Sequence, residues 1–112
     1  MMRNDSDRRR YPRVKAPILF RAARFRSARR PVVDVAIHGL RVYSDDAFKV
    51  GDRLDVELFL PDGDNLDCVV RVVWIQDLPQ GSPAQFDVGL QILDATGGGL
   101  ARLADVVDRY SP

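Results

Sequence analysis

The chain has 112 residues, 46% of them hydrophobic and 29% charged, which indicates one soluble globular domain with a single core. Its one cysteine excludes an internal disulfide framework, and no apolar stretch approaches the roughly 20 residues of a membrane-spanning helix. The polar, Arg-rich N-terminus has no apolar core segment and is therefore not a secretory signal, so we expect the protein in the cytoplasm.

The net charge of +1 hides a strong asymmetry along the chain. Residues 1–30 hold eleven basic residues against two acidic ones, a balance of +9, whereas residues 31–112 hold six against fourteen, a balance of −8. Fifteen of the seventeen cations are Arg, whose planar guanidinium suits phosphates and guanine edges. We therefore predict a flexible Arg-rich arm over residues 1–15 that meets an anion, followed by a folded domain over residues 16–112 that is acidic from residue 31 onward.

The first half of the body has the residue pattern of short β-strands. Apolar residues after Pro17 predict a strand over 18–25 with an Arg-rich outer face. Residues 32–35 predict a second strand and residues 40–42 a third, and the segment 34–39 lies at the link between them.

Strict alternation of apolar and polar residues makes the next strands clearer. Residues 54–60 alternate in this way and predict a half-buried strand, and the turn signal of residues 61–64 follows it. Residues 66–74 predict a long strand whose apolar face includes Trp74, and after a loop the residues 86–92 predict the last strand.

The C-terminal segment changes to a helical spacing of apolar residues, which fall at Leu100, Leu103, Val107 and Tyr110. This stripe predicts a helix over 98–109, with Asp94 or Thr96 as its N-cap. Because no helix separates the strands, the fold class is all-β, a small antiparallel barrel or sandwich with one C-terminal helix packed on it.

Candidate catalytic and metal-ligating groups are few. His38 is the only histidine and Cys68 the only cysteine, but Cys68 lies on the apolar face of its predicted strand, where a structural thiol is favoured over a nucleophile. One histidine cannot form a zinc site alone. Asp62, Asp64 and Asp67 resemble the start of a calcium loop, but the required Gly is absent from its place and position 73 is Val where the bidentate Glu is required, so a turn is favoured. We expect neither an enzyme nor a metal protein.

Two short segments favour binding instead. Four guanidiniums lie within six residues of the arm, at Arg8, Arg9, Arg10 and Arg13. Such groups bond guanine edges bidentately and pair with phosphates. Further on, Asp34 can accept hydrogen bonds from a guanine, and Gly39 permits close approach of the backbone. Taken singly, the first segment also fits a basic tail that only aids solubility, and the second fits ordinary turn residues.

In this order and spacing the two segments resemble the signature of the PilZ domain family. That signature is Arg-x-x-x-Arg, usually after another Arg, followed further along the chain by Asp/Asn-x-Ser-x-x-Gly. Residues 9–13, preceded by Arg8, match the first part, and residues 34–39 match the second. The similarity continues through the 72–74 and 88–92 segments. A second Arg-x-x-x-Arg, from Arg26 to Arg30, is too close to Asp34 and is interpreted as a strand end and turn.

The resemblance implies a six-stranded antiparallel β-barrel with a C-terminal helix. It also implies a ligand, cyclic di-GMP, and no cofactor. The implied function is that of a receptor or adaptor, which transmits this bacterial second-messenger signal to a separate, unidentified effector protein. Such effectors control motility, polysaccharide production or development. Neither membrane insertion nor specific nucleic-acid binding is expected.

The binding residues that the resemblance implies are Arg8, Arg9, Arg10, Arg13, Asp34, Ala36, His38 and Gly39. By analogy Arg9 and Arg13 grip guanine edges and phosphates, and Asp34 bonds a guanine. The other two arginines are supporting cations, which also leave room for an intercalated dimer of the ligand. His38 occupies a variable position, with its side chain exposed beside the ligand.

Ala36 departs from the signature, which usually has Ser at this position. A methyl group forms no hydrogen bond, and losing one costs about 0.5–1.5 kcal/mol, or roughly 2- to 12-fold in affinity. Because the Arg and Asp contacts are charge-assisted, we expect weakened rather than abolished binding. Ala36 also favours the alternative, a PilZ-like interaction module that binds no nucleotide, whereas the intact pair Arg9 and Arg13 argues against it.

Overall fold

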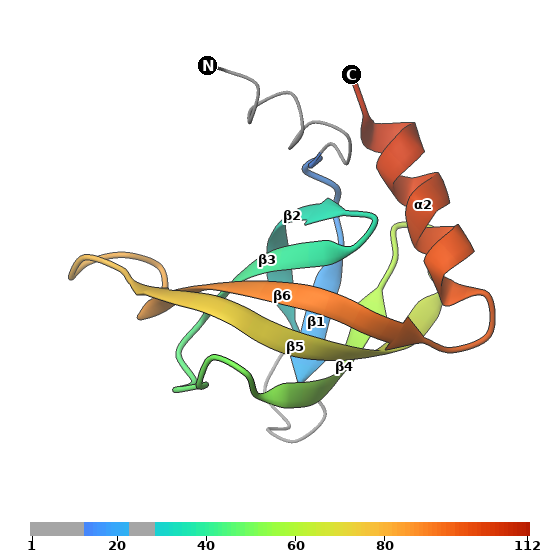
Figure 1. Cartoon of the computed structure of the whole chain (residues 1–112). Helices are drawn as coiled ribbons and strands as arrows, with labels where there is room; N and C mark the ends of the chain where they lie inside the picture. The colour runs from blue at the N-terminus through green and yellow to red at the C-terminus, as the bar shows by residue number, and fades with distance from the viewer. Residues whose placement is uncertain (1–12, 23–28) are drawn as a thin grey trace, which may run out of the picture.

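The computed structural model describes residues 13–22 and 29–112, and these form six β-strands and one helix (Figure 1). The elements are β1 (Leu19–Ala22), β2 (Arg30–Ala36), β3 (Gly39–Ser44), β4 (Arg53–Phe59), β5 (Asn65–Asp77), β6 (Phe86–Ala95) and α2 (Gly99–Tyr110). The strands are antiparallel in the order β1-β2-β3-β6-β5-β4, and β4 pairs with β1 to close a barrel. The six-stranded barrel with a C-terminal helix is confirmed.

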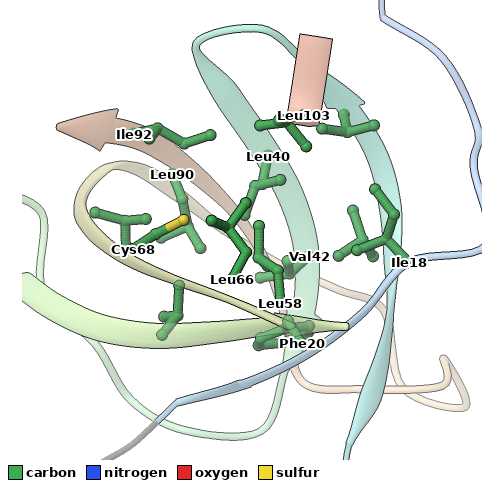
Figure 2. Packing of buried hydrophobic residues seen from close by; sticks show 14 of the residues in the cluster. Ile18, Phe20, Leu40, Val42, Leu58, Leu66, Cys68, Leu90, Ile92 and Leu103 are labelled. Carbon is green, nitrogen blue, oxygen red and sulfur yellow. The ribbon is translucent and has the colours of Figure 1, made fainter. Parts of the chain in front are cut away.

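Alternating apolar side chains fill the interior of the barrel. On β4, Leu54, Val56 and Leu58 are buried between more exposed charged residues, as the period-two pattern predicts. Figure 2 shows this core, in which side chains from the strands meet Leu103 of the helix. Cys68 belongs to the same cluster with 3% of its surface exposed, so its predicted place on the apolar face is confirmed.

Helix α2 packs against β2, β5 and β6 through a stripe that differs from the predicted one. Leu103, Val106 and Val107 are buried, whereas Leu100 is 42% exposed. The predicted N-caps were wrong. The cap is Gly98, in a left-handed conformation with φ of 71° that suits glycine. Among the described residues no helix is both long and apolar enough to cross a membrane.

The strand pairings contain three register shifts, and two of them decide which side chains reach the outer surface of β2 and β5. The pairing of β2 with β3 shifts between Val32 and Asp34, so Val33 is an extra residue and Asp34 faces outward. The pairing of β5 with β6 shifts between Val72 and Trp74 in the same way. The prediction that Trp74 shares the core face was therefore wrong, and its side chain is 39% exposed.

A short β-bridge at Val14, a residue within the predicted arm, attaches the N-terminal segment to the barrel. The Val14 amide donates to the Val35 carbonyl at 2.8 Å, and the Val35 amide donates back at 2.9 Å. Val14 is buried, so the backbone next to Arg13 is fixed to β2. At the opposite side of the barrel from α2, the far ends of β5 and β6 extend beyond the other strands (Figure 1).

Candidate functional site

The candidate site lies on the outer face of β2, β3, β6 and β5, where paired residues form rows across the sheet. In one row Asp34 pairs with Arg41, Arg41 with Gly89, and Gly89 with Trp74. Directly paired residues project from the same face of a sheet, so their side chains are neighbours. This row therefore brings a carboxylate, a guanidinium and an indole together on one surface.

A second row runs beside the first. Ala36 pairs with Gly39, Gly39 with Gln91, and Gln91 with Arg71. A hollow of about 770 Å³, open to solvent, lies over the two rows and is called the groove below. Its lining includes all the predicted binding residues that the structure describes: Arg13, Asp34, Ala36, His38 and Gly39. Arg8, Arg9 and Arg10 lie outside the described residues.

An ion pair joins the arm to β2 at the groove. Arg13 donates from Nε to Oδ1 of Asp34 at 2.7 Å, and the bridge at Val14 holds the adjoining backbone in place. The Arg13 side chain is about half exposed, whereas that of Asp34 is mostly covered. The structure thus joins one residue from each part of the signature, although 21 positions separate them in the sequence.

A second guanidinium, that of Arg41, connects Asp34 to a buried acid. Arg41 donates from Nε and Nη2 to Asp87 at 2.9 and 2.8 Å, and from Nη1 to Oδ2 of Asp34 at 3.5 Å. Asp87 is only 5% exposed. The hydrogen bonds to Asp87 raise the pKa of Arg41 above its usual value, although burial acts in the opposite direction. The carboxylate of Asp34 therefore lies between two guanidiniums, that of Arg13, which is half exposed, and that of Arg41, which Asp87 holds in place.

The turn between β2 and β3 fixes the position of Gly39 and His38. A Cβ on Gly39 would come within 2.9 Å of the Leu90 carbonyl oxygen, so this position requires glycine for close approach of β3 to β6. His38 is exposed at the turn, and its backbone carbonyl accepts from the Ile92 amide at 2.8 Å. Ala36, the residue before the turn, is 4% exposed.

Most of the groove lining was not predicted from the sequence as part of the site, including Arg41, Trp74, Asp87 and Gln91. Arg41, Asp87 and Gln91 stand between apolar neighbours on predicted strands, so the alternation alone indicated an outward direction. The alternation did not indicate which of the outward-facing positions form the site. The outward direction of Trp74 depends on the bulge before it, and the alternation of apolar and polar residues gives no sign of that bulge.

The other candidates lie away from the groove. Arg30 opens β2 and donates to Asp45 at 3.1 Å, and its partner in the second Arg-x-x-x-Arg, Arg26, lies outside the described residues. Oδ1 of Asp62 accepts from the Asp64 amide at 3.0 Å, which is turn chemistry. Across residues 13–22 and 29–112, no three His, Cys, Asp or Glu side chains converge as a metal site.

Comparisons with known proteins agree with the geometry. No curated protein matches the sequence. The solved structure of the inhibitor of motility MotI/DgrA from Bacillus subtilis is similar with a TM-score of 0.69 and 16% identity; the match covers 91% of this chain but only 50% of that one. The PilZ domain of YcgR from Escherichia coli, solved with c-di-GMP, has a TM-score of 0.65 and 17% identity over 92% of this chain and 91% of that one. The PilZ domain family model matches residues 7–109, so the chain belongs to the PilZ domain family.

Proposed function

We propose that this chain is a receptor for cyclic di-GMP that acts by binding and not by catalysis, in the cytoplasm. The observation that carries the proposal is the 2.7 Å contact of Arg13 with Asp34 at the groove, where the two parts of the family signature meet. Membership of the PilZ family supports it, and so does the likeness to a PilZ domain that was solved with c-di-GMP.

The chemistry of Asp34 suits a guanine. The base presents two parallel N–H donors, and a carboxylate offers two acceptor oxygens. In the structure Oδ1 accepts from Arg13 at 2.7 Å, while the Arg41 contact to Oδ2 is longer, at 3.5 Å. A guanine that bonds both oxygens therefore competes with Arg13 for Oδ1, and we infer that it displaces the Arg13 guanidinium. The freed guanidinium is then available for the acceptor edge of the base or for a phosphate.

This exchange supplies a route for the signal. Displacement of the Arg13 guanidinium breaks the ion pair between β2 and the residue that precedes the Val14 bridge. We infer that an effector protein reads the new position of the arm. Control of motility, polysaccharide production or development is the proposed output. MotI, named as an inhibitor of motility, supports the first of these, and this chain spans half of its length.

One observation favours a second candidate, an interaction module that binds no nucleotide. Ala36 lacks the hydroxyl of the family signature, and Asp34 already has guanidinium partners on both oxygens. In such a module the ion pair between Arg13 and Asp34 has a purely structural role and fixes the start of the arm.

Calorimetric titration with cyclic di-GMP separates the two candidates. For a receptor we expect binding at micromolar concentration or tighter, no binding of GTP, and a gain of roughly 2- to 12-fold for Ala36→Ser. Arg9→Ala and Arg13→Ala are expected to abolish binding while the fold survives. Arg30→Ala is the matched control, because Arg30 pairs with Asp45 away from the groove.

The contrary results are equally specific. Retained affinity in both Arg9→Ala and Arg13→Ala contradicts the proposed site. If the natural sequence gives no heat of binding with cyclic di-GMP but Ala36→Ser binds it, an otherwise complete site has lost its affinity for the ligand. The second candidate is then correct.

A further inference from the structure

Two arginines on the outer face of the barrel are direct cross-strand partners. Arg53 of β4 pairs with Arg71 of β5, and both side chains are exposed. Like charges that face each other in this way destabilise an antiparallel pair of strands. The pairing of Arg53 with Arg71 therefore reduces the stability of the folded protein. The pairing of β4 with β5 gives no reason for two positive charges to face each other.

The arginines of the other strands contrast with this pair. Arg21 of β1 contacts Glu57 at 2.7 Å, Arg30 of β2 contacts Asp45 at 3.1 Å, and Arg41 of β3 contacts Asp87 at 2.8 Å. Within the described part of the chain, no carboxylate forms an ion pair with the two arginines of β4 and β5. Neither of these two guanidiniums thus has a direct carboxylate partner there.

The pair also has a defined position relative to the groove. Nη2 of Arg71 donates to Oε1 of Gln91 at 2.9 Å, and Gln91 lines the groove and pairs with Gly39. Arg71 is two strands from Gly39, or about 10 Å at the usual strand spacing. Arg13 approaches the groove beside β2, so cations stand at both sides of it.

We propose that Arg53 and Arg71 form a second subsite, which binds a phosphate of the nucleotide held in the groove. This inference rests on the proposed function, because it assigns the far side of the same ligand. A phosphate oxyanion between two guanidiniums replaces their repulsion by two charge-assisted contacts. Gln91 orients Arg71 for this contact, so the guanidinium loses little freedom when the anion binds.

The binding test compares Arg53→Gln and Arg71→Gln with a control that removes the same charge elsewhere. Arg109→Gln is that control, since Arg109 lies in the last turn of α2. We expect Arg71→Gln to weaken binding of cyclic di-GMP about tenfold, with a shallower dependence on salt, and the control to bind normally. If Arg71→Gln binds as the natural sequence does while Arg13→Ala does not bind, the subsite is wrong and the proposed function stands.

A thermal test needs no nucleotide. In phosphate-free buffer, Arg71→Gln is expected to raise the melting temperature by about 1–5 °C, because the like-charge contact is removed. Inorganic pyrophosphate is expected to raise it for the natural sequence and for Arg109→Gln, but not for Arg71→Gln. If the natural sequence binds no cyclic di-GMP, the proposed function fails together with the nucleotide subsite, and the pyrophosphate shift then tests only whether Arg53 and Arg71 bind an anion. An equal pyrophosphate shift in all variants, or none in any, overturns the subsite.

Discussion

The indole of Trp74 lies against the backbone of Gly89, so closely that a Cβ on Gly89 would fall 2.1 Å from Nε1 of the ring. The two residues are cross-strand partners on β5 and β6, and the bulge before Trp74 turns the ring out of the core. Gly89 also pairs with Arg41 on its other side. Because Gly89 has no side chain, the indole can lie over it, on the same row as the charged residues Arg41 and Asp34.

Gly89→Ala is expected to displace the indole. A Cβ at 2.1 Å from Nε1 cannot be accommodated, and the ring is a rigid group that must rotate away. We expect a loss of about 1–3 kcal/mol in the free energy of unfolding and a red-shifted fluorescence spectrum. Trp74 is the only tryptophan, so its emission reports this site alone.

A double-mutant cycle provides the control for this contact. With Trp74→Ala in place, the added methyl group of Gly89→Ala meets no ring, so the second substitution should cost much less. Equal costs in the two backgrounds contradict the contact between Gly89 and the indole.

The buried acid Asp87 depends on Arg41 for compensation. Arg41→Met removes the hydrogen bonds that Nε and Nη2 of Arg41 donate to this carboxylate. We expect the substitution to reduce the free energy of unfolding by about 1–3 kcal/mol, measured by urea unfolding. Arg21→Met is the matched control. Its pair with Glu57 is partly exposed, and such pairs contribute about 0–1 kcal/mol. Similar losses in both variants contradict a special role for Arg41.

Much of the fold followed from the alternation of residues. Leu54, Val56 and Leu58 have the predicted burial, and the last strand and the C-terminal helix lie within a few residues of their predicted bounds. These elements bury one face against one core, so hydrophobic period and structure agree. The resemblance to PilZ domains then grouped Arg13, Asp34 and Gly39, which the structure brings together at the groove.

The wrong predictions have two physical causes, an extra residue in a strand and the backbone conformation at the start of the helix. The bulge before Trp74 reverses the side of the sheet for everything that follows it, and alternation contains no record of that shift. The helix begins after Gly98, whose left-handed backbone suits glycine, and no side chain caps the helix, so neither Asp94 nor Thr96 is the N-cap. The partners Arg41 and Asp87 are 46 positions apart and meet only through the order of the strands.

Gly39→Ala tests the close approach of β3 to β6. The new methyl group would stand 2.9 Å from the Leu90 carbonyl oxygen, which is backbone and cannot rotate away. We expect the two strands to separate at the turn, with a loss of about 1–3 kcal/mol and weaker amide protection at Ile92, which bonds the His38 carbonyl. Gly63→Ala is the control at a turn remote from the groove, where a Cβ meets nothing and only the positive φ opposes it. Unchanged exchange at Ile92 in Gly39→Ala contradicts this reading of the turn.

Burial of Cys68 predicts a specific loss of stability in alkali. Burial raises the pKa of this thiol from 9.0 to about 11, and the charges of Asp67 and Asp94 act in the same direction. The unfolded chain therefore releases the proton first. The contribution of the buried, protonated Cys68 thiol to the free energy of unfolding is fully present below pH 9. It is lost as the pH rises to about 11, by roughly 2–3 kcal/mol. Urea unfolding of the natural sequence and of Cys68→Ala between pH 8 and 11 measures it. The stability advantage of the natural sequence should shrink over this range, and a constant difference would mean that the folded protein does not hold the thiol protonated.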